Sequence, residues 1–284
     1  MVEHDAAPAG GVGAGDGGGA GGIGTLHAFA CGHTTHDVHQ LLRGAPRERR
    51  VFPAGVFLWS GGGRRVLFDT GYAPLPWATG VAGRLYRRLL PPVVPPGATL
   101  ADVVDTAAVT HVVLSHLHPD HVGGLAAVPH ARVLVSEGVR RRIAHPRLRD
   151  GVLRGLLPAD LTDRLEVVPD AAFRPGRAGL AVADPFGDGV YRLVRLPGHA
   201  DGQLGALVAD RVLLAGDAAW SRDLLGREGA LRALPRAVAH DADAQRDTAR
   251  RLLDLERAGT RLLFSHDEHP AGVDLLVAHD RGGP

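Results

Sequence analysis

Four ionisable side chains crowd into six residues directly after a short apolar run. The segment "HVVLSHLHPDHVGG" covers residues 111–124 and holds His116, His118, Asp120 and His121. Packing alone does not favour such a cluster at the end of a buried strand, because burying unpaired ionisable groups costs several kcal/mol. Imidazole and carboxylate groups are ligands for zinc, and also for iron or manganese. The cluster therefore predicts a metal site.

Three further side chains of the same types follow apolar runs later in the chain. His199 follows "VYRLVRLPG", Asp217 follows "RVLLAG" and His266 follows "TRLLFS". Any one of them alone is more often an ordinary loop residue. Together with the cluster they make five histidines and two aspartates, enough for two metal ions that share one carboxylate and a bridging oxygen. A water molecule between two such ions loses a proton near neutral pH and becomes a nucleophile.

The elements that must position these side chains are a series of strands followed by helices. Alternating and continuous apolar runs predict strands, and runs of helical period with Ser136 or Thr99 as N-cap predict helices. We expect strands over residues 25–31, 51–60, 64–71, 111–115, 131–137, 190–196, 203–208, 211–216 and 260–265. We expect helices over residues 81–90, 99–110, 136–145 and 241–259, and irregular chain over 146–188. Each candidate ligand then lies just past a strand end, where side chains can converge on a cleft.

Composition narrows the class of protein. The 284 residues carry a net charge of +1 and only 5% aromatic residues, so neither a polyanionic partner nor stacking platforms for bases are indicated, and we expect no nucleic acid. The single cysteine, Cys31, allows no internal disulfide, which fits a reducing compartment. Residues 1–24 are rich in Gly and Ala and are predicted to be disordered, with one domain over 25–284. No signal peptide or apolar span is visible, so we expect a cytoplasmic protein with no membrane partner.

Taken in order, these motifs resemble the metallo-β-lactamase superfamily. The resemblance rests on the HxHxDH hexad with Gly123–Gly124, "LFDTG" at 67–71, "PGH" at 197–199, "GD" at 216–217 and "SHD" at 265–267. It implies an α/β fold, the four-layer αββα sandwich with two mixed β-sheets, and a metal cleft at one edge of the sandwich. It also implies seven ligands: His116, His118 and His199 on a first ion, Asp120, His121 and His266 on a second, and Asp217 between them. The implied cofactors are two Zn²⁺ ions, with iron or manganese as alternatives.

Within the superfamily, the sequence looks most like the N-acyl-homoserine-lactone lactonases. That resemblance implies a hydrolase in which a bridging hydroxide attacks a small lactone or related ester, and in which Asp120 passes a proton to the departing alkoxide. The lactonase motif has a tyrosine three residues after the bridging aspartate, and this chain has Trp220 there. An indole N–H is a donor but has no titratable hydroxyl, so Trp220 either replaces the tyrosine as a donor or forms a wall of the pocket.

Several alternatives remain beside this prediction. A glyoxalase-II-like thioesterase or an organophosphate hydrolase would use the same fold and metals, and a non-catalytic metal-binding accessory protein would keep the fold and bind metal without catalysing a reaction. Asp69, inside "LFDTG", is either a hydrogen-bonding support for the metal loop or a turn residue at a strand end. A second cluster, Cys31, His33, His36 and His39, is either an extra metal site or, as we prefer, a polar loop after the first strand.

Overall fold

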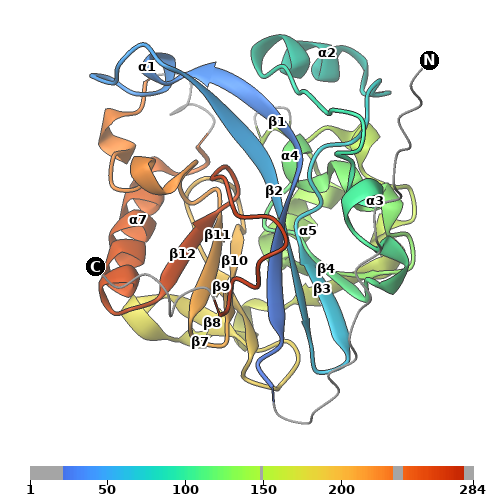
Figure 1. Cartoon of the computed structure of the whole chain (residues 1–284), viewed down its shortest axis with the longest axis vertical. Coiled ribbons are helices and arrows are strands. Elements are labelled where there is room, and N and C mark those ends of the chain that lie inside the picture. The colour runs from blue at the N-terminus through green and yellow to red at the C-terminus, as the bar shows by residue number, and fades with distance from the viewer. Residues whose placement is uncertain (1–21, 148–149, 233–238, 278–284) are drawn as a thin grey trace, which may run out of the picture.

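The computed structural model describes residues 22–147, 150–232 and 239–277 of the chain. Within them, two six-stranded sheets lie face to face (Figure 1). The first sheet runs in the order β1 (Thr25–Asp37), β2 (Arg49–Gly61), β3 (Arg64–Phe68), β4 (His111–Val113), β5 (Arg132–Ser136) and β6 (Leu165–Val168). The second runs in the order β12 (Arg261–Phe264), β11 (Val212–Gly216), β10 (Leu204–Val208), β9 (Tyr191–Arg195), β8 (Ala181–Ala183) and β7 (Arg174–Pro175).

Both sheets are mixed. In the first, β1, β2 and β3 pair antiparallel, and β3 to β6 pair parallel. In the second, all neighbours are antiparallel except β11 and β12. The parallel pairs place the carboxyl ends of β3, β4 and β5 at one edge, and those of β11 and β12 together in the other sheet. The loops that carry six of the predicted ligands start at the ends of β4, β11 and β12. His199 follows β9, which is antiparallel to β10 as β11 is, so β9 and β11 end on the same side of the sheet.

Alternation along the strands explains why each sheet is covered on both faces. In β3, Val66 and Phe68 belong to the apolar cluster between the sheets, whereas Leu67 belongs to the cluster on the outer face. In β11, Leu214 points into the same central cluster and Leu213 points outward. Because side chains alternate with a period of two, strands that are apolar throughout must be buried on both faces.

Helices close the two outer faces. The helices are α1 (Val38–Leu41), α2 (Gly80–Leu89), α3 (Leu100–Val103), α4 (Pro119–Val122), α5 (Glu137–Ala144) and α7 (Ala242–Arg257). Single 3₁₀ turns are η1 (Thr106–Ala108), η2 (Gly123–Ala127), η4 (Arg154–Leu156), η5 (Leu161–Arg164), η6 (Asp170–Ala172), η7 (Arg177–Gly179), η8 (Arg222–Leu224) and η9 (Glu228–Ala230).

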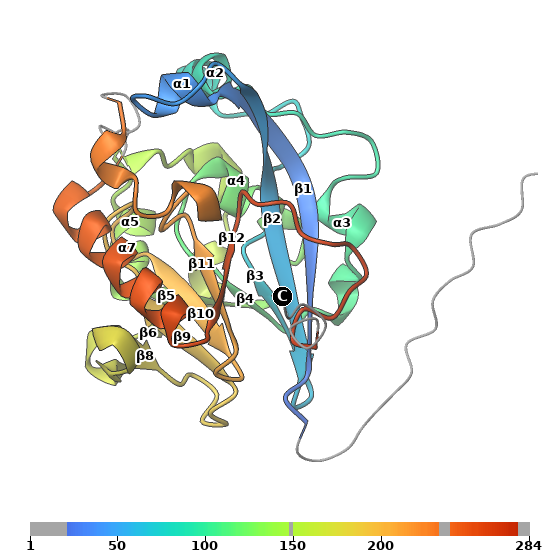
Figure 2. The ribbon, with the colours of Figure 1, turned by 60° about the vertical axis from the view of Figure 1, so that its left-hand side comes forward.

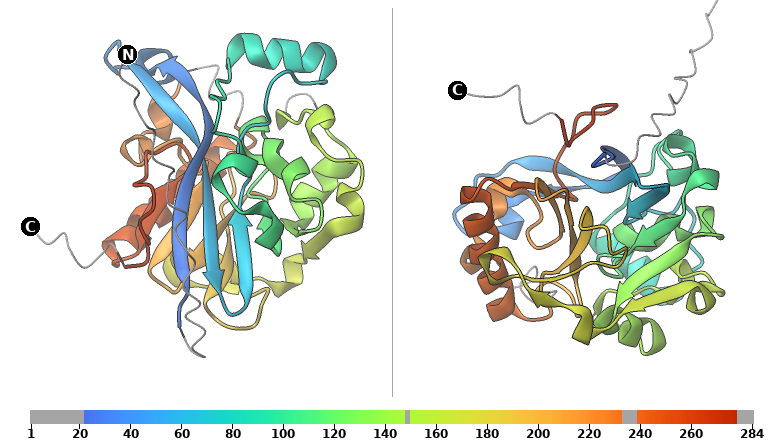
Figure 3. Two further views of the ribbon diagram at one scale, coloured as in Figure 1. Left: turned by 45° about the vertical axis from the view of Figure 1, so that its right-hand side comes forward. Right: turned by 90° about the horizontal axis from the view of Figure 1, so that it is seen from below.

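Residues of α3 and α5, including Leu100 and Val139, pack on the first sheet, and Leu252 of α7 packs on the second. Figure 2 shows α7 along the second sheet, and Figure 3 shows helices on the outer sides of both sheets. The helix–sheet–sheet–helix order confirms the predicted αββα sandwich.

The longer helices begin where the sequence predicts. The Ser136 side chain accepts a hydrogen bond from the backbone N–H of Val139 at the start of α5, and Asp241 accepts from Asp243 and Ala244 at the start of α7. These bonds satisfy amide groups that have no partner inside the helix. Thr99 is the N-cap as predicted and forms a capping box with Asp102, but the helix that it starts is only the four-residue α3.

Three expectations about secondary structure were wrong. Strand β1 does not end at residue 31 but continues to Asp37 past a register shift between Ala30 and His33. The segment 146–188 is not wholly irregular, because it contains β6, β7 and β8. The helix expected over 99–110 ends at Val103 and is followed by the turn η1. The β-branched Val103, Val104 and Thr106 have low helix propensity, which disfavours a longer helix.

The strand extension also corrects the interpretation of the second cluster. Cys31, His33 and His36 belong to β1 and His39 to α1, so they do not form a polar loop after the first strand. Among the described residues, the groups that could hold a metal ion do not include them. The second cluster is therefore part of the sheet and its connection.

Residues 1–24 were predicted to be disordered, and residues 1–21 of that segment lie outside the described residues. Ile23, near the start of the described residues, packs against the central core, and its carbonyl accepts a hydrogen bond of 3.0 Å from the Trp59 indole. No helix in the described part of the chain is long and apolar enough to cross a membrane. The assignment of 25–284 to one domain stays a prediction.

Candidate metal centre

The structure brings all seven predicted ligands to one end of the sandwich. His116, His118, Asp120 and His121 lie after β4, on the connection to α4 and in its first turn. The other three come from the second sheet, after β9, β11 and β12: His199, Asp217 and His266. They form two groups that share Asp217, and within each group the candidate ligand atoms lie within 4.8 Å of one another. The site is thus assembled from both sheets.

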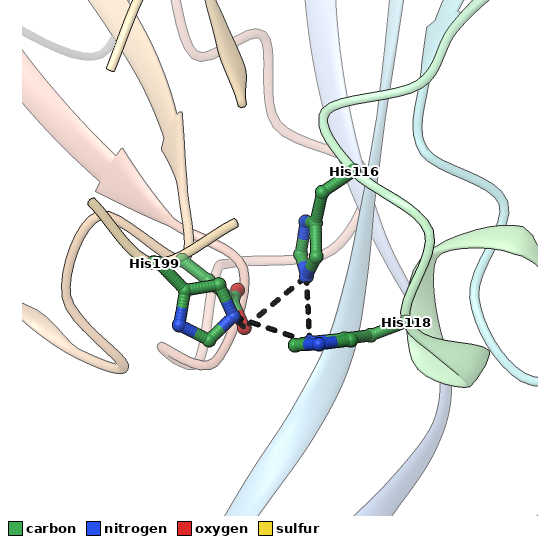
Figure 4. Close-up of side chains that lie close together, drawn as sticks. His116, His118 and His199 are labelled. Carbon is green, nitrogen blue, oxygen red and sulfur yellow. Dashed lines mark hydrogen bonds and ion pairs between the residues drawn. The ribbon is translucent and has the colours of Figure 1, made fainter. Parts of the chain in front are cut away.

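The first group contains three imidazoles whose nitrogens face one another. His116 Nε2 lies 2.9 Å from His118 Nδ1, and His199 Nε2 lies 3.1 Å from the same atom. Figure 4 shows the three rings pointing toward a common centre. Asp217 Oδ2 lies 3.6 Å from His199 Nε2 and 4.0 Å from His116 Nε2. A tetrahedral zinc ion separates its ligand nitrogens by about 3.3 Å, close to these spacings.

The second group places two imidazoles between two carboxylates. Asp217 Oδ1 lies 3.3 Å from His121 Nε2, and Asp217 Oδ2 lies 3.1 Å from His266 Nε2. Asp120 Oδ2 lies 3.8 Å from His121 Nε2 and 3.6 Å from His266 Nε2. Asp217 therefore lies between both groups, which is the position a bridging carboxylate requires.

Hydrogen bonds to the Nδ1 atoms of two histidines determine which ring nitrogen is free to coordinate a metal ion. His121 Nδ1 lies 2.7 Å from the Asp69 carboxylate, and His266 Nδ1 lies 2.6 Å from the Pro53 carbonyl. Both partners are acceptors, so each Nδ1 carries the proton in the neutral ring. Each Nε2 then directs a lone pair at the candidate ion, as in metal sites where a carboxylate or carbonyl holds the ligand histidine.

Asp69 also organises the start of the hexad through Ser115. Its carboxylate accepts hydrogen bonds from the Ser115 backbone N–H at 2.8 Å and from the Ser115 hydroxyl at 2.7 Å. Because that hydroxyl donates to Asp69, its oxygen accepts from His116 Nδ1, 2.9 Å away. Asp69 thus supports two of the histidines, which favours the supporting role over that of a simple turn residue.

The donor set fits a cation and is unsatisfied without one. His121 Nε2 and Asp217 Oδ1 are buried and make no hydrogen bond with the residues that the structure describes. In the first group, a neutral His118 ring has only one N–H, so its Nδ1 can donate to His116 Nε2 or to His199 Nε2 but not to both. Buried polar atoms without partners are costly, and a metal ion would satisfy all of them at once.

The electrostatics of the two groups differ. Burial lowers the pKa of His199 to about 3 and holds the pKa of His116 well below its usual value, so both rings are neutral and able to coordinate. Burial also disfavours charge on His121 and His266, but neighbouring carboxylates raise the pKa of His266 to about 9 and that of His121 well above its usual value. The carboxylates of the second group thus attract positive charge, which a metal ion would supply instead of protons.

The hexad loop is held by close backbone contacts. The backbone N–H and hydroxyl of Thr70 both donate to the His121 carbonyl, each at 2.8 Å. Gly123 lies two residues after His121, and a Cβ atom there would lie 2.0 Å from the backbone nitrogen of Ala73. Only glycine allows this approach, which explains the glycine that follows the hexad.

Trp220 lies beside the first group. Its ring meets the edge of Phe52 at a centroid distance of 5.9 Å, and Phe52 in turn meets His266 at 6.3 Å. A small hollow is lined by both Trp220 and His199. The structure therefore places Trp220 at the wall of the centre, next to a ligand.

A cavity of about 160 Å³ opens on the first group, and part of its wall was not foreseen from the sequence. Besides the three histidines it is lined by Arg142, Asp150 and Asp201. Arg142 and Asp201 are 59 positions apart, and α5 carries adjacent arginines that are typical of a solvated face. No local signal distinguished Arg142. The signal that could have identified Ser115 is its place immediately before the hexad.

Comparison of the sequence with known proteins identifies metal-dependent hydrolases as relatives of this chain. The family model described as the metallo-beta-lactamase superfamily matches residues 50–258. A probable metallo-hydrolase of Mycobacterium tuberculosis is 30% identical over 231 residues, which cover 76% of this chain and 70% of that protein. The N-acyl homoserine lactonase AttM of Azorhizobium caulinodans is 31% identical over 169 residues, covering 58% and 60%.

Among solved structures, a mutant of AiiA from Bacillus thuringiensis with N-decanoyl-L-homoserine bound at its active site superposes with a TM-score of 0.66. The superposition covers 86% of this chain and 93% of that one at 16% identity. At that identity the likeness concerns the fold alone.

Proposed function

Because the chain belongs to the metallo-beta-lactamase superfamily and is a metallo-hydrolase, we propose that it is a dinuclear zinc enzyme that hydrolyses a lactone or related carboxylic ester. The observation that carries this proposal is the position of Asp217 between two groups of ligands. A carboxylate shared in this way holds two cations at neighbouring positions. The names of the lactonase relatives support a carboxylic ester as substrate.

The donor set favours zinc over manganese. Five imidazoles and two carboxylates suit zinc, which takes nitrogen ligands in four-coordinate sites, whereas manganese prefers sites rich in oxygen. We assign His116, His118 and His199 to the first ion, and Asp120, His121 and His266 to the second, with Asp217 between them. When bound, the two ions supply a hydroxide nucleophile near neutral pH and polarise the ester carbonyl.

The protein's own residues supply position and proton transfer. Asp69, Ser115 and Pro53 hold three ligand histidines in the tautomer that coordinates. Asp120 Oδ2 lies within 3.8 Å of both imidazoles of the second group, where the carboxylate can carry a proton to the departing alkoxide. The Trp220 indole beside the first group donates a hydrogen bond to the substrate oxygen, in place of the tyrosine of the lactonase motif.

The first experiment measures metal and substrate together. We expect two zinc ions per chain in the purified protein, and hydrolysis of one or more lactones with ring-opened product identified by mass. Thioesters and organophosphate esters belong in the same panel, because turnover of these alone would assign the enzyme to a different branch of the superfamily. Bound zinc with turnover of no ester of any class would favour the non-catalytic alternative.

A pair of variants tests the ligand assignment. His118→Ala removes one of the three nitrogens of the first group and should lower zinc content and abolish hydrolysis. His130→Ala is the matched control, because His130 only contacts the Val109 carbonyl away from the centre. Full activity of His118→Ala would contradict the assignment.

Trp220→Phe tests the proposed donor. It keeps an aromatic ring against Phe52 and removes the indole N–H. We expect kcat to fall by about tenfold or more with little change in KM, because one donor to the developing oxyanion is lost. An unchanged kcat would leave Trp220 as a wall of the pocket only.

A further inference from the structure

Helix α2 presents an apolar stripe to solvent. Val81, Leu85 and Leu89 lie four residues apart, which places them on one face of the helix, and they are 71%, 49% and 52% exposed. Of the eight large apolar residues that are exposed in the described chain, five lie within residues 75–93. Single exposed apolar residues are ordinary, but a group of them on one face marks an interaction surface.

The opposite face of α2 is fixed to the rest of the protein by aromatic side chains. The Tyr86 hydroxyl lies 3.1 Å from the Tyr72 hydroxyl, and the Trp77 ring packs against both tyrosine rings at centroid distances of 5.9 Å. Figures 1 and 2 show α2 at the same end of the molecule as α1. These contacts hold the helix in one orientation, so the apolar stripe stays on the outside.

The same helix carries arginines without acidic partners. Arg84, Arg87 and Arg88 make no ion pair with any described residue, and the sequence contains no Asp or Glu between Asp69 and Asp102. In α7, by contrast, every arginine pairs with an aspartate of the same helix. Charges paired along a helix are typical of a solvated surface. The arginines of α2 instead leave a local excess of positive charge.

The positive charge continues into a groove beside α2. The groove is lined on one side by residues at the start of the helix, including Ala82, and on the other by residues 144–147 and 152–155. The arginines in its lining are Arg147 and Arg154, both exposed, and no carboxylate of a described residue lines it. The surface around α2 is therefore basic as well as apolar.

This combination of apolar and basic residues decides between partners. A second copy of the chain would bring the arginines of two α2 helices together with no carboxylate from either segment, and like charges that meet at an interface are unfavourable. An anionic lipid surface offers phosphate groups to the arginines and apolar chains to the stripe. A basic amphipathic helix is typical of proteins that bind such a surface.

We propose that α2 is an interfacial helix that docks the protein on an anionic lipid bilayer, with its apolar stripe in the headgroup layer and its arginines on the lipid phosphates. Such a helix lies in the plane of the surface, so the proposal is compatible with the lack of a membrane-spanning helix among the described residues. It departs from the expectation of no membrane partner, which considered only spans and signal peptides. It does not rest on the proposed lactone hydrolysis.

The first experiment measures sedimentation of the full chain with vesicles of phosphatidylcholine alone, or with about 30% phosphatidylglycerol to supply anionic headgroups. We expect binding to the anionic vesicles and much weaker binding to the neutral ones. Binding to the anionic vesicles should fall when salt rises from about 0.1 M to about 0.5 M, because salt screens the charges. Equal binding to both kinds of vesicle, or binding to neither, would overturn the proposal.

A triple variant tests the charges of the helix. Arg84→Gln, Arg87→Gln and Arg88→Gln together should weaken binding to the anionic vesicles about 100-fold, since one arginine near such a surface contributes about fivefold. Thermal unfolding and zinc content of the variant separate loss of fold from loss of docking. Parental binding by a folded triple variant would show that α2 does not contact the lipid.

The matched control removes the same number of positive charges from α7. It combines Arg246→Gln, Arg250→Gln and Arg257→Gln, and these arginines pair with aspartates of their own helix. We expect vesicle binding to change by less than about threefold, because charges far from the docking face are screened. A loss equal to that of the α2 variant would mean that net charge alone drives binding, which contradicts a specific docking helix.

A fluorescent reporter tests whether the apolar stripe enters the headgroup layer. Leu85→Trp places an indole in the stripe, and its emission should shift to shorter wavelength and be quenched by brominated lipid when anionic vesicles are added. Arg250→Trp, on the exposed face of α7, is the control and should show neither change. Vesicle binding with unchanged emission from Leu85→Trp would assign the contact to another face and refute the role of α2.

The remaining alternative is a contact between copies of this chain. Sedimentation of the protein without lipid compares the parent with a variant that combines Val81→Ser, Leu85→Ser and Leu89→Ser. An oligomer that the serine variant loses, together with no vesicle binding by the parent, would overturn the proposal in favour of self-association. Vesicle binding is measured without substrate, so a protein that binds anionic vesicles but hydrolyses no ester would keep this inference and lose only the proposed function.

Discussion

Asp69→Asn replaces one carboxylate oxygen with an NH₂ group and leaves the size of the side chain nearly unchanged. Asp69 is the residue that supports the histidines of the metal centre. The Asp69 carboxylate accepts three hydrogen bonds, from the Ser115 amide, the Ser115 hydroxyl and His121 Nδ1. Its backbone has a φ of 62°, which asparagine tolerates, so the variant adds no backbone strain. Asparagine can keep the bond to the Ser115 amide, but its NH₂ group then faces His121 Nδ1.

That change reverses the tautomer of His121. To accept a hydrogen bond from the asparagine NH₂, His121 Nδ1 must lose its proton, and the proton then moves to Nε2, the atom directed at Asp217. A protonated Nε2 cannot coordinate. Loss of such a supporting group typically weakens metal affinity about 10- to 100-fold, which is about 1.4 to 2.7 kcal/mol. The loss should be larger for the second ion, because His121 contacts the replaced oxygen directly, whereas His116 of the first group depends on it only through the Ser115 hydroxyl.

The assay is zinc stoichiometry during titration with a graded chelator, followed by reactivation with added zinc. We expect Asp69→Asn to release the ion of the second group at a chelator strength at which the parent keeps both, and to release the ion of the first group only at a higher chelator strength. Asp102→Asn is the control, since Asp102 caps α3 at the surface. Two ions bound with parental affinity in Asp69→Asn would refute the tautomer argument.

Three further predictions follow from packing and burial. Gly151→Ala should lower zinc content and activity, because a Cβ atom there would lie 2.5 Å from His118 Cδ2 and the backbone φ is +69°; metal analysis checks this. Leu252→Ala, at a fully buried position on the second sheet, should reduce the free energy of unfolding by about 2 to 5 kcal/mol, as measured by denaturant unfolding. Leu85, whose side chain is 49% exposed, is the control, and Leu85→Ala should change that free energy by about 0.5 kcal/mol or less. Burial raises the pKa of the Cys31 thiol from 9.0 to about 12, so it stays protonated at pH 8, and thiol labelling should be about 1000-fold slower in the folded than in the unfolded protein.

The site was more predictable from the sequence than the elements around it. All seven candidate ligands follow a strand end, which predicted from spacing and residue type that they converge on a cleft. Their division between two ions came from the family resemblance. The roles of Ser115 and Pro53 could not be predicted in the same way. They depend on which ring nitrogen each histidine turns outward, which only the packed structure determines.

Segments with weak periodicity account for the wrong elements. β7 is Arg174–Pro175 and β8 has three residues, too short for an alternating pattern, and prolines and glycines around them favoured a loop. Their pairing with the second sheet, a long-range interaction, stabilises them. Arg142 was not identified for a related reason, since its partner Asp201 is brought close only by the fold.

The split origin of the ligands has a consequence for the whole molecule. Four of the seven come from the first sheet and three from the second, and each group draws on both. Cations bound at these groups would therefore connect the first sheet to the second. A ligand that binds only the folded chain at about 1000 times its dissociation constant adds about 4 kcal/mol of stability. Under the proposed function, the stability of the folded protein depends on the metal supply, and removal of the ions would weaken the connection between the two sheets as well as abolish hydrolysis.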